Sequence, residues 1–88
     1  MIDRFDLLEQ AKDTVKDRGQ QYGTVADNFS RTALIWSAIL GTNVTAQQVG
    51  LCMIGLKVAR LSYDQNAADG WVDIAGYAAC GGEVTKTE

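Results

Sequence analysis

The stretch VTAQQVGLCMIGLKVARLSY, residues 44–63, is the part of the chain that decides its fold class. Its second residue is Thr45, and Gln48 follows three residues later, which is the pattern of a capping box at the start of a helix. The only charges after this start are Lys57 and Arg60. A helix with so few charges must be covered by protein over most of its circumference. Residues 45–63 are therefore predicted to form a largely buried helix, in which small residues such as Gly50 allow another helix to come close.

Two further helices are predicted before this stretch. Residues 3–17 carry apolar side chains at helical spacing, and Gly19 is expected to end that helix in a left-handed conformation. Residues 25–40 form the second, with Thr24 as the N-cap and Gly41 as the stop.

A fourth helix is predicted over residues 70–80, capped by Asp69 and ended by Gly81 and Gly82, with residues 83–88 as a frayed tail. The sequence thus predicts one all-α domain over residues 1–88, an antiparallel bundle of about four helices. A domain of 88 residues and 9.5 kDa buries only about 60–65% of its unfolded surface, so its core needs assistance. We expect this assistance from oligomerisation, with part of the third helix facing another copy of the chain.

The composition excludes several kinds of site. There is no histidine, and Cys52 and Cys80 are far apart in the sequence, which excludes the usual Cys/His zinc site and histidine-dependent nucleophiles. We expect both cysteines to be free thiols. The net charge of −3 and the pI near 4.7 argue against a nucleic acid polymer as partner.

Residues 32–56 contain no charge, but the polar loop 41–48 interrupts them. We interpret them as two buried helices and not as a membrane span, so no membrane partner is expected. No signal peptide opens the chain, which predicts a cytoplasmic location.

Lys57 and Arg60 stand three residues apart, so they project from one side of an otherwise uncharged helix. One interpretation is a network of salt bridges, with Asp64 pairing with Arg60 and with Asp69 or Asp73 contributing from the next helix. The other interpretation is that the two cations receive phosphate groups.

Arg18 is a third candidate for phosphate binding. Aromatic side chains can add a stacking surface for a nucleotide base, or they can simply belong to the core. The candidates are Tyr22, Trp36, Trp71 and Tyr77.

Several motifs together resemble a family of short bacteriophage and prophage proteins of unknown function, often labelled MazG-like. The resemblance covers about residues 7–82, and the motif at residues 69–77 is its most specific part. The motifs are Asp17-Arg18, Tyr22-Gly23, Asn28-Phe29, Trp36-Ser37, Leu40-Gly41, Lys57-Val58-Ala59-Arg60 and Asp69-Gly70-Trp71-Val72-Asp73-Ile74-Ala75-Gly76-Tyr77. The label implies kinship with the all-α nucleoside triphosphate pyrophosphohydrolases. Those enzymes are helical oligomers that bind magnesium through Glu-x-x-Glu and Glu-x-x-Asp pairs and cleave between the α and β phosphates.

The chain departs from that enzyme pattern at the metal site. Lys57-x-x-Arg60 replaces the first pair and Gly70-x-x-Asp73 replaces the second. Two cations in place of carboxylates repel magnesium, but they can take over its neutralisation of phosphate charge.

The main hypothesis is therefore a phage-type protein that holds a phosphorylated nucleotide without hydrolysis, as in sequestration of a host antiviral signal, with no metal or cofactor. The predicted nucleotide-binding residues are Arg18, Tyr22, Asn28, Lys57, Arg60, Asp69, Asp73 and Tyr77. The first alternative is a magnesium-dependent MazG-like pyrophosphohydrolase with an altered site at Asp64, Asp69 and Asp73. The second alternative is a structural or protein-interaction module.

Overall fold

The computed structural model describes residues 2–87 of the chain. This part of the chain contains four α-helices and no strand, which confirms the all-α prediction. The helices are α1 (Arg4–Tyr22), α2 (Val25–Leu40), α3 (Ala46–Tyr63) and α4 (Ala68–Thr87).

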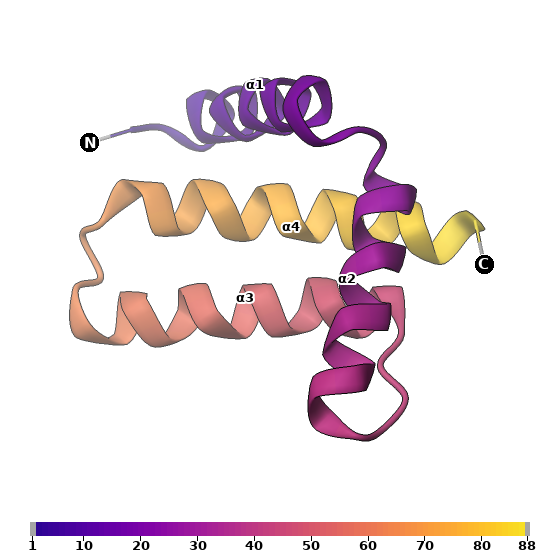
Figure 1. The fold of residues 1–88 in the computed structure, drawn as a ribbon. Helices are drawn as coiled ribbons and strands as arrows, with labels where there is room; N and C mark the ends of the chain where they lie inside the picture. Colours follow the sequence, from indigo (N-terminus) through magenta and orange to yellow (C-terminus); the bar gives the residue numbers. More distant parts are fainter. Residues whose placement is uncertain (1, 88) are drawn as a thin grey trace.

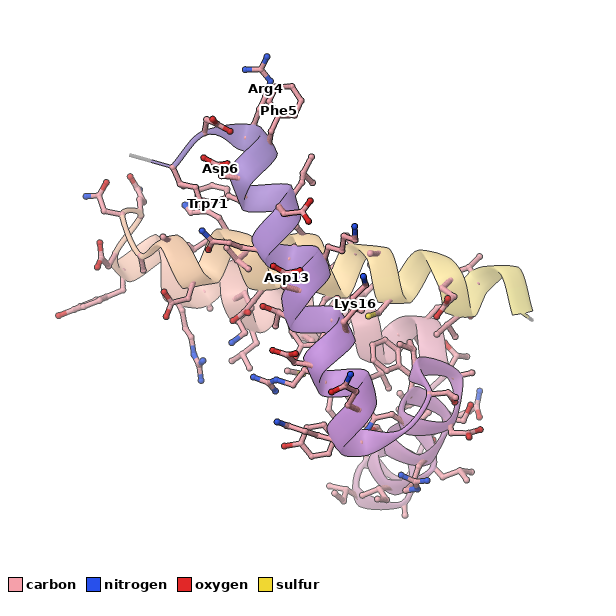
Figure 2. The ribbon with its side chains drawn as sticks, turned by 90° about the horizontal axis from the view of Figure 1, so that it is seen from above. Arg4, Phe5, Asp6, Asp13, Lys16 and Trp71 are labelled. Carbon is pink, nitrogen blue, oxygen red and sulfur yellow. The ribbon has the colours of Figure 1, made fainter. Side chains whose placement is uncertain are left out.

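The helices α3 and α4 form an antiparallel pair, and the other two helices cross it (Figure 1). The helix α1 lies on the side of α4 that faces away from α3 and crosses α4 obliquely (Figure 2). The helix α2 runs across both members of the pair, near the start of α3 (Figure 1). The predicted antiparallel arrangement is thus present in the α3–α4 pair, whereas α1 and α2 pack at an angle to it.

The helix termini that have strong capping residues lie where the sequence predicted them. The Thr24 side chain accepts a hydrogen bond from the Asp27 amide at 3.2 Å, and α2 ends at Gly41 with a left-handed φ of 68°. The capping box of α3 is complete, because the Gln48 amide donates to the Thr45 hydroxyl at 3.1 Å and the Thr45 amide donates to the Gln48 side chain at 2.9 Å.

The predictions that Gly19 and the Gly81–Gly82 pair end helices, and that Asp69 is a cap, were wrong. The helix α1 continues through Gly19 and ends at Gly23, whose φ is 87° and whose amide donates to the Gly19 carbonyl at 3.1 Å. Asp69 lies in the first turn of α4 and is not its N-cap. A glycine ends a helix where it adopts the left-handed region, and in residues 2–87 only Gly23 and Gly41 have a positive φ.

The helix α4 also continues through Gly81 and Gly82 to Thr87, past the predicted end at residue 80. The frayed tail predicted over residues 83–88 stays a prediction. Glu88 lies outside the described residues. Val84, which is only 2% exposed, belongs to the main core cluster. Burial of this side chain favours continuation of the helix over the weak stop signal of two glycines.

The core lies where α2 crosses the α3–α4 pair. Its buried members are Phe29, Ala33, Ala46, Val49 and Val84. Gly50 is the close-approach position that the sequence suggested, because a Cβ there would lie 3.4 Å from the Gly81 Cα. Several of these side chains are alanine or valine, so the core is thin.

Over residues 2–87 no helix has both the length and the apolar character that crossing a bilayer requires. The structure contains a single chain, so oligomerisation stays a prediction.

Candidate ligand-binding site

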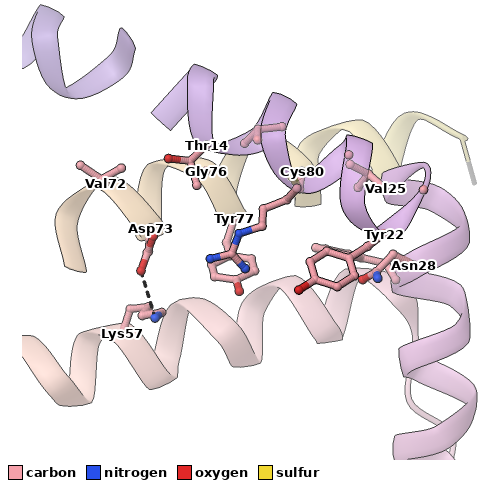
Figure 3. Close-up of a pocket in the computed structure, with 15 residues that line it drawn as sticks. Thr14, Tyr22, Val25, Asn28, Lys57, Val72, Asp73, Gly76, Tyr77 and Cys80 are labelled. Atoms are coloured by element: carbon pink, nitrogen blue, oxygen red, sulfur yellow. Dashed lines mark ion pairs between the residues drawn. The ribbon is translucent and has the colours of Figure 1, made fainter. Parts of the chain in front are cut away.

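A cavity of about 210 Å³ lies between α1 and α3, bordered by α2 and α4 (Figure 3). The helix α1 packs mainly on α4, which leaves space between α1 and α3. We call this space the four-helix cavity, because all four helices and the turn after α1 line it. Its lining residues are Thr14, Val15, Arg18, Gly19, Tyr22, Gly23, Val25, Asn28, Phe29, Lys57, Val72, Asp73, Gly76, Tyr77 and Cys80.

The helix α1 presents one side to the cavity along two turns. Thr14, Arg18 and Tyr22 are four residues apart, so they lie on the same side of the helix. The buried Gly76 lets α1 come close to α4, since a Cβ there would lie 3.4 Å from a methyl carbon of Val15. This crossing brings the α1 residues over the cavity.

Lys57 of α3 and Asp73 of α4 form an ion pair across the cavity (Figure 3). The Lys57 Nζ lies 3.0 Å from the Asp73 Oδ2, and the two side chains are 15% and 28% exposed. This contact confirms the salt-bridge interpretation for Lys57, with Asp73 as the partner among the acids that the sequence offered. The pair joins the two helices of the antiparallel hairpin and fixes the polar end of the cavity.

Arg18 is the other charged residue in the wall. Its side chain is exposed, and the ion pairs formed among residues 2–85 do not include it. Because the charges of Lys57 and Asp73 cancel, the lining carries a net charge of +1 that comes from Arg18 (+1 +1 −1). A guanidinium binds phosphate or carboxylate through two parallel hydrogen bonds.

Two tyrosines and an asparagine stand along the cavity toward α2 (Figure 3). Tyr22 is 56% exposed, whereas Tyr77 is partly buried against the core cluster. Their rings and hydroxyls can contact a flat, polar ligand, and the Asn28 amide can both donate and accept hydrogen bonds.

Cys80 also lines the cavity, and sequence reasoning did not assign it to a site. Burial raises the pKa of its thiol, and the negative charge of Glu83 raises it further. The thiol therefore stays protonated near neutral pH, so it contributes a small, weakly polar surface and not a thiolate nucleophile. Cys52 and Cys80 are both free thiols, as predicted.

Six of the eight predicted site residues line the cavity, and Arg60 and Asp69 do not. Both of these side chains are exposed. Successive positions three apart on a helix differ by about 60° in direction, and here Lys57 faces α4 while Arg60 lies toward solvent. The two cations therefore do not converge on one point.

The tryptophans considered as stacking surfaces also lie elsewhere. Trp36 packs against the core cluster, and the Trp71 Nε1 donates a hydrogen bond to the Gln65 carbonyl at 3.0 Å. The aromatic residues that line the cavity are Tyr22, Tyr77 and Phe29.

The acidic residues named for a metal site are not gathered. In the part of the chain that the structure describes, no three histidine, cysteine, aspartate or glutamate side chains come together as ligands for one ion. Asp73 of that set is engaged by Lys57.

Sequence reasoning missed Thr14, Gly76 and the apolar floor, which includes Val15 and Val72. Thr14 was detectable, because it lies one turn before Arg18 on the same side of α1. The apolar residues were not, since their spacing is equally that of a helix packed on the core.

Comparison with known proteins places the chain among phage-related sequences. It is 38% identical over 76 residues to the Gene 55 protein of Mycobacterium phage L5, a match that covers 84% of this chain and 49% of that protein. It is 33% identical over 75 residues to the Gene 55 protein of Mycobacterium phage D29, with 84% of this chain and 50% of that protein covered. The chain thus spans about half the length of these relatives.

No solved structure matches the chain. The phage relatives confirm the phage part of the predicted resemblance, while kinship with MazG stays a prediction. Residues 6–85 match the family described as Domain of unknown function (DUF6378), and the match covers nearly all of the sequence. The chain is therefore a member of the DUF6378 family.

Proposed function

We propose that the four-helix cavity binds a phosphorylated nucleotide and holds it without hydrolysis. The observation that carries this proposal is the convergence of Arg18, the Lys57–Asp73 pair and two tyrosines on one cavity. A ligand that carries both an anion and an aromatic ring matches the cationic and the aromatic residues of this cavity.

The charges of the wall favour an anionic ligand. Arg18 is available because it has no ion-pair partner among residues 2–85. The Lys57 ammonium has three donors, and its ion pair engages one Asp73 oxygen, so two donors are left for a ligand. We place the phosphate at Arg18, within reach of Lys57, and the base against the ring of Tyr22 or Tyr77.

The volume limits how much of the ligand is enclosed. Drug-sized ligands occupy clefts of about 300–1,000 Å³, and the four-helix cavity holds about 210 Å³. It therefore takes one part of a nucleotide, and the remainder lies in the open space in front of the exposed Tyr22. A mononucleotide fits this arrangement better than a long polyphosphate chain.

The position of Lys57 supports binding without hydrolysis. A metal ion at Asp73 has to displace an ammonium group that lies 3.0 Å from the carboxylate. Fixed cations then perform the charge neutralisation that magnesium performs in a hydrolase. Because the relatives are bacteriophage proteins, sequestration of a nucleotide signal in the host cytoplasm is the biological setting that we propose.

Calorimetric titration with nucleoside mono-, di- and triphosphates and cyclic dinucleotides, each with and without magnesium, tests the proposal. We expect one of them to bind equally well without magnesium, and to be recovered intact after denaturation of the complex. Arg18→Ala should weaken binding about 10- to 100-fold, since a hydrogen bond to a charged group contributes about 1.5–3 kcal/mol. Lys16→Ala is the matched control, because it removes an exposed cation from the same helix outside the cavity (Figure 2).

The alternatives predict different results in the same experiment. Magnesium-dependent product formation indicates a MazG-like pyrophosphohydrolase and contradicts the proposal. No binding and no turnover with any nucleotide leaves the protein-interaction module as the explanation. Equal loss of affinity in Arg18→Ala and Lys16→Ala indicates nonspecific attraction to positive charge and contradicts ligand binding in the four-helix cavity.

A further inference from the structure

The helix α3 has one face that is not covered by the rest of the fold. The side of α3 toward α4 carries the buried Val49, Gly50 and Leu61 and the ion-paired Lys57. On the side away from α4, no other helix of residues 2–87 runs alongside α3 (Figure 1). This uncovered side is the α3 outer face.

Uncharged residues, all small except Gln48, form the middle of the α3 outer face. They follow one another in alternating steps of four and three residues, which is the spacing of a seam between two packed helices. All five of these residues are exposed: Gln48, Cys52, Gly55, Ala59 and Ser62. Nothing lies within 4 Å of a Cβ placed on Gly55, so a second helix can approach the backbone there.

Large apolar side chains stand on both sides of this seam. Leu51 is 67% exposed and Val58 is 53% exposed on one side, and Leu56 is 43% exposed and Tyr63 is 95% exposed on the other. Within each of these two pairs the residues are seven apart, so each pair runs parallel to the seam. Small residues flanked by large ones allow close helix contact with side chains packing around it.

The end of α2 extends this apolar surface. Its C-terminal half projects past α3 on the side away from α4 (Figure 1) and carries Leu34, Ile35, Ile39 and Leu40, each of which is more than half exposed. A standard specific interface takes about 800 Å² from each partner, and the eight large apolar residues named on α2 and α3, which are 43–95% exposed, supply surface for it.

We propose that the α3 outer face binds the same face of a second copy of this chain, forming a two-fold homodimer. A second copy fits because none of the residues named for this surface on α2 and α3 is charged, so two identical faces meet without like-charge repulsion. Around a two-fold axis the small seam residues of the two copies meet, which lets the two α3 helices approach closely at Gly55. The proposal is independent of any ligand in the four-helix cavity, which faces α1.

Light scattering coupled to size exclusion at micromolar concentration tests the dimer. We expect the wild-type protein at twice the chain mass of 9.5 kDa. Ala59→Glu places a charge in the seam at an exposed helical position, and we expect this variant at 9.5 kDa with unchanged helix content by circular dichroism. Gln20→Glu, which adds the same charge on the exposed side of α1, should leave the mass doubled. A monomeric wild type, or a dimeric Ala59→Glu, overturns the proposal.

Mild oxidation gives a second readout on a folded protein. A parallel pair of α3 helices brings Cys52 against Cys52, and an antiparallel pair brings the centre of the seam, Gly55, against itself. Disulfides require Cα atoms about 4.4–6.8 Å apart, so we expect a covalent dimer through Cys52 in the wild type or through position 55 in Gly55→Cys. Gln20→Cys serves as the control and should not cross-link through position 20. Failure of both seam positions to cross-link overturns the proposal.

Discussion

Substitution of Gly70 by alanine tests how closely α3 and α4 pack at the end of their hairpin. Gly70 is buried in the first turns of α4, and a Cβ there would lie 2.7 Å from the Leu61 Cδ2 and 2.8 Å from its Cγ. Rotation about χ2 of Leu61 moves its Cδ atoms but leaves Cγ in place, so this rotation alone does not relieve the clash with Cγ. Leu61 is itself only 5% exposed, so it has little room to shift.

The magnitude follows from two opposing terms. Overpacking of a core costs about 1–3 kcal/mol, while alanine in place of glycine stabilises a helix interior by up to about 1 kcal/mol. We expect Gly70→Ala to lower the free energy of unfolding by about 1–2 kcal/mol. For a domain of this size about 1 kcal/mol corresponds to roughly 4–8 °C in Tm, so the melting temperature should fall by roughly 5–15 °C.

Gly82→Ala is the matched control for this experiment. Gly82 lies in the same helix and is exposed, and nothing lies within 4 Å of a Cβ placed there. The same substitution should therefore raise Tm by a few degrees, within the roughly 4–8 °C that about 1 kcal/mol represents. Thermal unfolding followed by circular dichroism, at one fixed protein concentration, measures both variants.

A result of equal or higher Tm for Gly70→Ala would refute the packing argument. A double-mutant cycle with Leu61→Ala, which removes the clashing Cγ and Cδ atoms, then locates the cause. If the clash is the cause, Gly70→Ala should cost less in the Leu61→Ala background than in the wild type. Equal costs in both backgrounds would show that Leu61 is not the residue that resists the added methyl group.

Three further predictions concern the cavity and a helix cap. Asp73→Asn leaves Lys57 unpaired, so ligand titration should show an affinity for the anionic ligand that is raised about 3- to 10-fold. The free energy of unfolding should fall by about 1 kcal/mol. Loss of binding would contradict the assigned phosphate position. Since burial raises the pKa of the Cys80 thiol, its alkylation, followed by mass spectrometry, should need a higher pH than that of an ordinary thiol, and labelling at the pH of a free thiol would refute this. The stability that the protonated thiol contributes is present below the ordinary thiol pKa and is lost as pH rises through the raised pKa. Thr45→Ala removes half of the α3 capping box and should lower stability by about 1 kcal/mol in urea unfolding, whereas an unchanged midpoint would show that the cap contributes nothing.

Helix ends were predictable where a side chain makes the cap. Thr24 and Thr45 marked the starts of α2 and α3 because their hydroxyls accept backbone hydrogen bonds locally. Gly19 and Gly82 misled the prediction, since glycine is a stop only when tertiary structure places it in the left-handed region. Burial of Val84 by other helices extends α4, and no local pattern contains that information.

The cavity was predictable in its chemistry and not in its geometry. Lys57 was identifiable as a cation that needs an anionic partner on an otherwise uncharged helix, Asp73 as one of its possible partners, and Arg18 as a further candidate for phosphate binding. The separation of Arg60 from Lys57 depends on the rotation of α3 about its axis, and packing against α4 sets that rotation. The sequence placed both cations on one side of a helix, but a difference of about 60° decides which of them reaches the cavity.

The most direct test of the central claim is a nuclear magnetic resonance titration with the nucleotide that binds in calorimetry, in the presence of magnesium. Amide shifts of the labelled protein locate the ligand, and phosphorus spectra of the same sample report whether it is cleaved. We predict shifts concentrated at Arg18, Asn28, Asp73 and Tyr77, with the phosphorus spectrum of the intact nucleotide unchanged over time. Shifts confined to the α3 outer face, or the appearance of cleaved phosphate, would contradict the account.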